Sequence, residues 1–422
     1  MAKYEKYKDS GIPWLGMIPE HWEIKQLRSF LRLFSEKGHG DAQLLSVTRE
    51  QGVIERDKED KEENHNYVPE DLSGYKHILP GDFVINKMKA WQGSYAVSKY
   101  DGIVSPAYFT CKLSGVDNAF FSHAIRSKTY VGFFASYSKG IRVGQWDLDP
   151  KALKSIPFFL PPLAEQKKIV DYIESKTLKI DSYVAERERE LRLLDELKQA
   201  QIAEAVTHGL NPDVKMKDSG IPWIGMIPEH WEMIKAKYVL KPRKIVVGSK
   251  SDTYDLLSLT LKGVIKRDMD NPTGKFPASF DSYQEVHNGD FVFCFFDNEE
   301  TPRTVGLSEY NGMITGAYDV FECCNDNICP KFLLYYYLTI DDAKHMKPLY
   351  RGLRKTIPYD SFMRYRIPVP PLSEQQDIVD FIDNKCNNIN SLIEELEAEI
   401  AYLKEYKQRL IADAVTGQIK VF

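Results

Sequence analysis

Two short segments of this 422-residue chain concentrate cationic, amide and aromatic side chains. The first, residues 86–95, reads NKMKAWQGSY and follows a GDFV sequence at 81–84. The second, residues 297–304, reads DNEETPRT and follows another GDFV sequence at 289–292. Lys and Arg suit contacts to phosphates, and Arg, Lys, Asn, Gln, Ser and Thr can hydrogen-bond base edges in a groove. Because the two segments differ strongly at equivalent places, they would suit two different target sequences.

Two further segments share a Gly-x-Arg sequence, which favours phosphate gripping over base reading. They read SKGIRVGQW at 138–146 and YRGLRKT at 350–356. The candidate DNA-contacting residues of the first half are Arg49, Lys87, Lys89, Trp91, Gln92, Ser94, Tyr95, Lys139, Arg142 and Gln145. Those of the second half are Asn298, Thr301, Arg303, Thr304, Arg351, Arg354 and Lys355. For any one of them, a solvated surface charge is the alternative interpretation.

The charge and composition of the chain neither indicate nor exclude a nucleic-acid partner. The net charge of -5 argues mildly against one, because phosphate binding needs local positive potential. Residues 76–154, however, hold eleven Lys and Arg against five Asp and Glu. No apolar run approaches the length of about 20 residues that a membrane helix needs, and the first residues do not resemble a signal peptide. Six cysteines without regular spacing indicate reduced thiols, so we expect a cytoplasmic protein.

Motifs for catalysis within the chain are missing. There is no D/N-P-P-F/Y loop of the kind that grips an extruded adenine, no G-x-G-x-x-G sequence and no P-loop. His21 and His230 have no serine or cysteine elbow nearby and are interpreted as structural. Four thiols of one region could suggest a zinc site, but their spacing does not follow the usual C-x2–4-C pairs, and buried free cysteines are the default interpretation. Those thiols are Cys294, Cys323, Cys324 and Cys329.

The chain is two copies of one unit. Residues 8–23 (KDSGIPWLGMIPEHWE) and 217–232 (KDSGIPWIGMIPEHWE) differ at a single position and are separated by an offset of 209 residues. The same offset relates PPLAEQ at 161–166 to PPLSEQ at 370–375. Between these anchors the halves diverge, although short alternating apolar runs predict strands throughout. The Trp residues of the repeated preambles, Trp14, Trp22, Trp223 and Trp231, are interpreted as anchors between domain and helix.

Two long helices are expected at 164–208 and 373–416. Apolar residues recur in an a/d pattern over about four heptads of the second helix, which is typical of a coiled coil. The predicted pairing residues are Ile173, Ile180, Val184, Leu191, Leu194, Ile382, Ile389, Ile393, Leu396, Ile400, Leu403 and Leu410. Arg187 and Gln201 weaken the first seam. Ser373 with Gln376 suggests a capping box, and Gly209 and Gly417 suggest C-terminal caps. About 44 residues would make a rod of roughly 65 Å, with antiparallel pairing preferred over helices that pack separately on their own domains.

The paired preambles, paired PPL(A/S)EQ helix entries and paired AVT helix ends closely resemble the specificity (S, HsdS-type) subunits of type I restriction–modification systems. The resemblance covers essentially the whole chain. It implies an α+β fold with two duplicated α/β target recognition domains separated by two long antiparallel coiled-coil helices. The expected parts are a preamble at 1–23, recognition domain 1 at 24–160, a central spacer helix at 161–209, a linker with the repeated preamble at 210–232, recognition domain 2 at 233–369 and a C-terminal spacer helix at 370–422.

The resemblance implies a non-catalytic subunit that reads a bipartite, asymmetric site on double-stranded DNA. It further implies two methyltransferase (M) subunits, which bind S-adenosylmethionine and methylate adenine at N6, and two restriction (R) subunits that use ATP and Mg²⁺. No cofactor, metal or membrane is expected for this chain itself. The rival interpretations are a coiled-coil scaffold whose repeated domains bind proteins, and a self-contained nuclease or methyltransferase, which the missing motifs disfavour.

Overall fold

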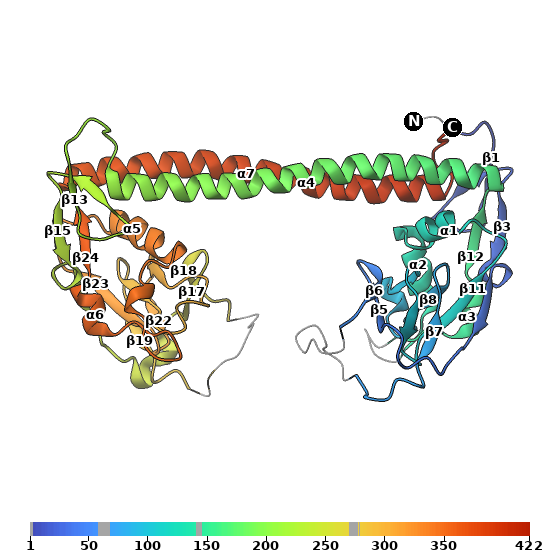
Figure 1. Cartoon of the computed structure of the whole chain (residues 1–422), viewed down its shortest axis with the longest axis horizontal. Helices are drawn as coiled ribbons and strands as arrows, with labels where there is room; N and C mark the ends of the chain where they lie inside the picture. Colours follow the sequence, from blue (N-terminus) through green and yellow to red (C-terminus); the bar gives the residue numbers. More distant parts are fainter. Residues whose placement is uncertain (1–2, 58–67, 141–145, 270–276, 278) are drawn as a thin grey trace. The chain divides into compact units, whose positions relative to one another are not determined.

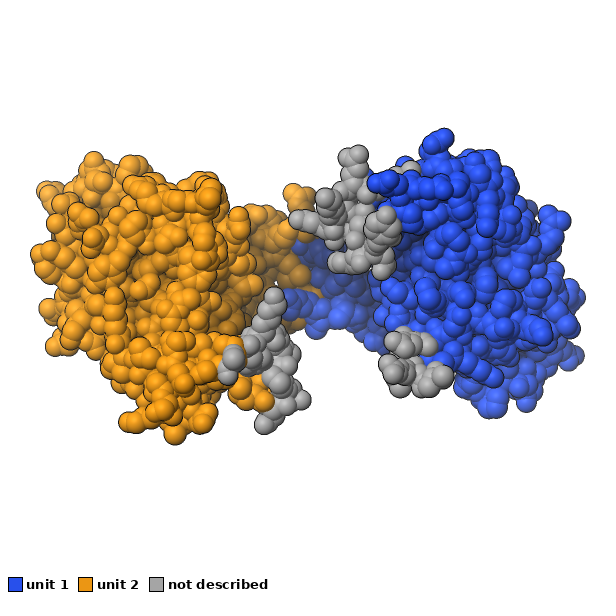
Figure 2. Space-filling model, turned by 90° about the horizontal axis from the view of Figure 1, so that it is seen from below, with its two compact units in different colours: residues 1–188, 397–422 blue, residues 189–396 orange. Residues whose placement is uncertain are grey.

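The chain folds into two compact units (Figure 2). Our computed structural model describes residues 3–57, 68–140, 146–269, 277 and 279–422. Unit 1 comprises Met1–Glu188 and Glu397–Phe422, and unit 2 comprises Arg189–Leu396. Each unit therefore takes a stretch of both long helices, one from each repeat.

Unit 1 is a mixed domain built around an antiparallel four-stranded sheet of order β4–β11–β8–β9. Smaller antiparallel pairs surround it, namely β1–β2, β3–β12, β5–β6 and β7–β10. Its strands are β1 (Tyr7–Asp9), β2 (Met17–Pro19), β3 (Glu23–Gln26), β4 (Leu31–Phe34), β5 (Leu45–Thr48), β6 (Gly52–Glu55), β7 (Lys76–Ile78), β8 (Phe83–Ile85), β9 (Tyr95–Val97), β10 (Gly102–Val104), β11 (Phe109–Leu113) and β12 (Pro157–Leu160). Its short helices are α1 (Asn118–Ile125), α2 (Lys128–Tyr137) and α3 (Pro150–Ser155) (Figure 1).

Unit 2 repeats this topology, with a four-stranded sheet of order β16–β23–β20–β21. Its strands are β13 (Met216–Asp218), β14 (Met226–Pro228), β15 (Glu232–Lys235), β16 (Leu240–Pro242), β17 (Leu257–Thr260), β18 (Gly263–Lys266), β19 (Gln284–Val286), β20 (Phe291–Phe293), β21 (Val305–Leu307), β22 (Gly312–Ile314), β23 (Asp319–Cys323) and β24 (Arg366–Val369). Its short helices are α5 (Pro330–Asp342) and α6 (Tyr359–Arg364). One helix, α5, follows β23, whereas α1 and α2 follow β11.

The repeated GDFV sequence forms the centre of each sheet. In β8, Phe83 and Ile85 face the larger core while Val84 faces a smaller one, as expected for a strand whose side chains alternate. The side chains of β20 alternate in the same way, with Phe291 and Phe293 in the larger core and Val292 in the smaller one. The Asp of each motif closes the preceding turn, because the Oδ2 of Asp82 accepts from the backbone N–H of Leu79 at 2.9 Å. The repeat is therefore retained where it builds the sheet.

Two long helices, α4 (Leu163–His208) and α7 (Leu372–Val415), run antiparallel to each other within each unit. In unit 1 the ammonium of Lys407 lies 2.6 Å from Asp181, and Arg187 lies 3.2 Å from Glu399. In unit 2, Lys198 donates to the side chain of Asn390 at 2.7 Å. Residue numbers rise along α4 as they fall along α7, which is the antiparallel arrangement expected.

The predicted seam residues of both helices are all buried or half-buried. Arg187, which was expected to weaken the seam, instead pairs across to Glu399 and lies over the Tyr183 ring. The capping box at Ser373 is wrong, because α7 already begins at Leu372 and the Pro371 carbonyl accepts from the N–H of Gln375 at 3.0 Å. Gly209 and Gly417 have φ of 77° and 72° just beyond the helix ends, so the predicted glycine caps are confirmed.

A carboxylate in the first turn of each long helix, buried in unit 1 and half-buried in unit 2, holds the repeated preamble. Glu165 accepts from the indole N–H of Trp22 at 3.0 Å and contacts Nε2 of His21 at 2.8 Å. In unit 2, Glu374 accepts from Trp231 at 3.1 Å and contacts His230 at 2.7 Å. These contacts support the structural interpretation of both His residues and of Trp22 and Trp231, whose side chains are fully buried.

The Gln that follows each carboxylate joins the helix to the domain. Gln375 is fully buried, and its side chain accepts from the N–H of Cys329 at 2.7 Å and donates to the carbonyls of Asn327 and Pro370, each at 2.9 Å. Gln166 similarly accepts from the N–H of Asp117 at 2.9 Å and donates to the carbonyl of Pro161 at 2.8 Å. The PPLxEQ sequence is therefore a connection between helix and domain.

The end of each long helix packs into the core of the unit that contains the other repeat's preamble. Val206 of α4 belongs to the unit 2 core with Trp231, and Val415 of α7 belongs to the unit 1 core with Trp22. The repeated AVT sequence is buried in both places. The α+β fold with duplicated domains and long paired helices is thus confirmed. Across the described ranges, we find no helix long and apolar enough to cross a membrane.

We predict that Gln375→Ala lowers the free energy of unfolding by about 1–3 kcal/mol, because it leaves buried backbone groups without partners. Urea unfolding of the full chain, followed by circular dichroism, measures the change. The neighbouring Gln376→Ala is the matched control, since Gln376 is exposed and bonds only to Asp380; its effect should stay within about 0.5 kcal/mol. Equal effects of the two substitutions would contradict the connecting role.

Candidate nucleic-acid interface

In unit 1 the structure brings together the two segments that the sequence singles out. Lys87 pairs with Asp147 at 3.1 Å, and the ring of Trp91 lies 5.1 Å from that of Trp146. The N–H of Leu148 also donates to the carbonyl of Lys87 at 3.1 Å. A short turn of 3-10 helix, Ala90–Gln92, carries Trp91 and Gln92 at this place. Residues 86–92 therefore adjoin residues 146–148 in unit 1.

Two residues of this segment that were predicted to contact DNA are buried, so that prediction is wrong for them. Tyr95 is fully buried on β9, where its ring stacks on Phe134 with centroids 3.9 Å apart. Burial also raises the pKa of its hydroxyl. Ser94 is buried beside it. Both residues follow the turn at Gly93 and enter the sheet, so they support the loop from behind and are removed from the candidate contact set.

The other described candidates of unit 1 are exposed or half-buried. Lys89 and Lys139 are exposed, and neither forms an ion pair within the described part of the chain. Arg49 is exposed and pairs with Glu50 at 3.2 Å, which reduces its net charge. Arg142 and Gln145 lie outside the described residues.

In unit 2, residues 297–304 and 350–356 also meet. Arg354 donates to both carboxylate oxygens of Asp297, at 2.6 and 3.2 Å, and its guanidinium lies over the Phe296 ring. This contact lowers the pKa of Asp297 and raises that of Arg354. Lys355 lies 3.8 Å from Glu299. The same pair of segments therefore adjoins in both units, but with different side chains.

Several side chains of unit 2 that were predicted to contact DNA point into the domain instead. Thr304 is buried and donates to Asp341 at 2.6 Å, and Arg303 lies 2.9 Å from Asp342. Asn298 is buried and donates to the carbonyl of Lys355 at 3.4 Å. These three residues hold the loops to α5 and to each other, so they are corrected from DNA contacts to loop supports. Thr301 is half-buried, and its carbonyl accepts from Lys344 at 2.8 Å.

The tip of the 350–356 loop is exposed and carries a cation. A β-bridge joins Arg351 to Thr356, and Leu353 between them is fully exposed. Arg351 donates only to the carbonyls of Tyr350 and Pro348, at 2.9 and 3.3 Å, so among the described residues its charge is not neutralised by a carboxylate. Sequence reasoning selected Arg351 but missed Leu353, because an apolar residue carries no signal for exposure.

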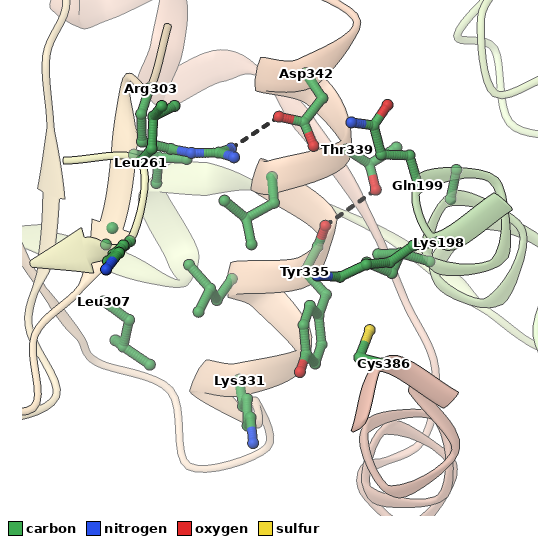
Figure 3. Close-up of a pocket in the computed structure, with 18 of the residues that line it drawn as sticks. Lys198, Gln199, Leu261, Arg303, Leu307, Lys331, Tyr335, Thr339, Asp342 and Cys386 are labelled. Carbon is green, nitrogen blue, oxygen red and sulfur yellow. Dashed lines mark hydrogen bonds and ion pairs between the residues drawn. The ribbon is translucent and has the colours of Figure 1, made fainter. Parts of the chain in front are cut away.

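A cavity of about 1310 Å³ in unit 2 was not expected from the sequence. It lies between α5, the ends of α4 and α7 that belong to this unit, and the β17–β18 turn (Figure 3). Its charges are internally balanced, since Lys331 lies 2.6 Å from Asp383 and Arg303 pairs with Asp342. Burial raises the pKa of the Cys386 thiol, which disfavours the reactive thiolate. The cavity therefore has neither the net charge of a phosphate site nor an activated nucleophile.

The geometry defines a protein of two like domains on paired helices, each presenting a different polar loop surface. Proteins with similar sequences and structures point to the same kind of architecture. Residues 315–402 match the family model of the type I restriction modification DNA specificity domain. The chain is 23% identical to the putative type I restriction enzyme MjaX specificity subunit of Methanocaldococcus jannaschii, covering 99% of this chain and 98% of that one.

A second relative, the type I restriction enzyme MjaVIII specificity subunit of the same organism, is 22% identical over 96% of this chain and 94% of its own. A solved structure described as the basis of complex assembly and conformational transition of the type I R-M system shares the fold, with a TM-score of 0.66 at 15% identity over 95% of this chain and 99% of that one. Over nearly its whole length the chain is therefore similar to specificity subunits of type I restriction enzymes.

We predict that Arg351→Ala weakens DNA binding by the full chain and lowers the slope of log K against log salt by about 0.9, the loss expected for one phosphate contact on duplex DNA. Fluorescence anisotropy over a series of salt concentrations measures both quantities. Lys385→Ala is the control, because Lys385 is an exposed cation on α7 of the same unit, away from the loops. An unchanged slope for Arg351→Ala would remove this loop from the interface.

Proposed function

We propose that the chain reads a bipartite, asymmetric DNA sequence, with one half-site for each unit. The observation that carries this proposal is the contrast between framework and loops. Both units share one strand order and one Trp–Glu–Gln connection to the helices. At the equivalent loop surface, however, unit 1 presents Lys87 and Trp91, whereas unit 2 presents Arg351 and Arg354 with Asp297. Shared attachment with different surfaces suits two different half-sites.

In this proposal the long helices act as the spacer between the two recognition domains. Each recognition domain leads directly into the N-terminal end of its own long helix, and the two helices pair antiparallel. Equivalent domains attached to antiparallel helices would read the two half-sites in opposite orientations. One helical turn of DNA advances about 34–36 Å, so helices of 46 and 44 residues have sufficient length to span more than one turn.

Chemistry would come from partner subunits. We propose that two methyltransferase subunits dock on this chain, bind S-adenosylmethionine and methylate one adenine at N6 on each strand. Two restriction subunits would add cleavage that depends on ATP and Mg²⁺. Support comes from the missing methyltransferase and P-loop motifs in this sequence and from the similarity of the chain to type I restriction enzyme specificity subunits.

The proposal is tested by mapping N6-methyladenine in DNA of cells that express the methyltransferase partner, with and without this chain. We expect methylation at a split, asymmetric motif only when the chain is present. Exchanging residues 24–157 for those of another specificity subunit should change one half of the motif and leave the other intact. A well-formed complex with an active partner but no chain-dependent methylation would favour the protein-binding scaffold instead.

A further inference from the structure

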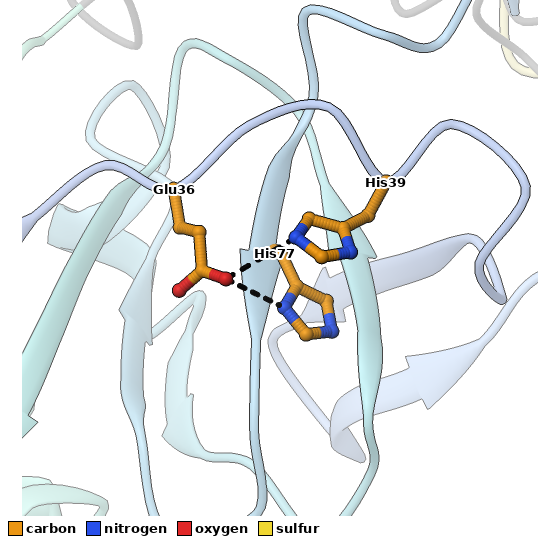
Figure 4. A group of neighbouring side chains, drawn as sticks. All are labelled: Glu36, His39 and His77. Carbon is orange, nitrogen blue, oxygen red and sulfur yellow. Dashed lines mark hydrogen bonds and ion pairs between the residues drawn. The ribbon is translucent and has the colours of Figure 1, made fainter.

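A cluster of two imidazoles and a carboxylate lies at the surface of unit 1, outside the loops discussed above. Glu36 and His39 belong to the irregular segment 35–43 between β4 and β5, and His77 lies on β7 (Figure 4). Their ligand atoms all lie within 4.8 Å of one another, and across the described ranges no other such cluster of His, Cys, Asp and Glu occurs. The spacing along the sequence does not reveal this group, because its members are 41 residues apart at the extremes.

The spacing of the ligand atoms suits a tetrahedral ion. One Glu36 carboxylate oxygen lies 3.2 Å from Nε2 of His39 and 3.6 Å from Nδ1 of His77. Bonds of about 2.0–2.1 Å at a tetrahedral angle place ligand atoms roughly 3.3 Å apart. In Figure 4 the carboxylate faces one nitrogen of each ring. The three atoms therefore surround a position that one small cation could occupy.

A second observation points in the same direction. The other nitrogen of His77, Nε2, lies 2.8 Å from a carboxylate oxygen of Asp101. A histidine that ligates a metal typically donates its remaining N–H to a carboxylate, which fixes its tautomer and leaves the first nitrogen free to coordinate. Asp101 thus holds His77 in the form that a metal requires, with Nδ1 directed at Glu36.

The backbone preorganises the group. The N–H of His77 donates to the carbonyl of Glu36 at 2.8 Å, and the N–H of Gly38 donates to the carbonyl of Ser73 at 3.1 Å. The two imidazoles are stacked, with centroids 4.1 Å apart and planes inclined by 20°. Binding an ion requires the rings to tilt toward it, and the exposed His39 has room to do so.

Unit 2 provides an internal comparison. The N–H of Glu285 donates to the carbonyl of Ile245 at 2.8 Å, so these residues occupy the places of His77 and Glu36. Neither imidazole is present there. His287 contacts Glu285 at 3.2 Å without a third ligand, which makes it a matched exposed His–Glu pair.

We propose that Glu36, His39 and His77 bind one divalent transition-metal ion, with zinc the best match, and that Asp101 orients His77 from behind. Two imidazoles and a carboxylate suit zinc, and water can fill the fourth position at this exposed site. The ion clamps segment 35–43 onto β7 in unit 1 alone. This proposal is independent of the proposed DNA-reading function and revises the expectation that the chain holds no metal.

The test uses the full chain, stripped of metal and titrated with Co²⁺ and with Zn²⁺. We expect one site per chain, with visible Co²⁺ bands that lack thiolate charge transfer, because no cysteine belongs to the group. His39→Gln and His77→Gln should each weaken binding at least tenfold, and Asp101→Asn about 10- to 100-fold. The control His287→Gln should leave binding unchanged. Zn²⁺ should also slow amide exchange at 36–42 and 76–78 but not at 245–251 and 284–286.

Three outcomes would overturn the proposal. One is the absence of binding by the folded wild-type chain at micromolar metal. Another is binding that persists unchanged in His39→Gln and His77→Gln. The third is a thiolate charge-transfer band, which would assign the ion to the cysteines of unit 2. Circular dichroism of each variant checks its fold, and substitution of the exposed His39 is the least disruptive of the set.

Discussion

The contact between a carboxylate at the start of each long helix and the repeated preamble is the interaction on which the architecture depends. Glu165 and Glu374 each accept a hydrogen bond from a fully buried Trp indole and contact a His of the same preamble. A carboxylate in the first turn is also favoured by the N-terminal end of the helix dipole. Removing the donors would leave a charge without partners in a largely apolar place, which is costly. Preamble, domain and helix are thereby held as one body in each unit.

This constraint explains why the repeats are retained at their ends and diverge between them. The residues that connect helix to domain cannot be substituted without loss of a hydrogen bond, because each polar group is paired with a particular partner. Gln375, for example, is paired with three backbone groups. The loops at 297–301 and 350–356 are held by contacts among themselves, such as Arg354 with Asp297. Their side chains can therefore change without disturbing the connection between helix and domain.

Much of the fold could be predicted because its signals are local or repeated. Heptads predicted α4 and α7 to within one residue at each end, and the offset of 209 residues predicted equivalent domains. The sequence selected segments whose members adjoin in each unit, and their contact with DNA stays a prediction. Individual residues were less predictable: Tyr95 and Thr304 have the right chemistry, but sheet packing and Asp341 turn them inward. Leu353 and the Glu36–His39–His77 group depend on tertiary placement, which spacing along the sequence does not encode.

The central proposal is that two like frameworks read different half-sites through the different loops that they carry. The most direct measurement replaces residues 233–366 with a second copy of residues 24–157 and maps the N6-methyladenine motif produced with the methyltransferase partner. The account predicts an inverted repeat, in which the half-site of unit 1 occurs twice in opposite orientations. Retention of the original asymmetric motif by a folded chimera would contradict it.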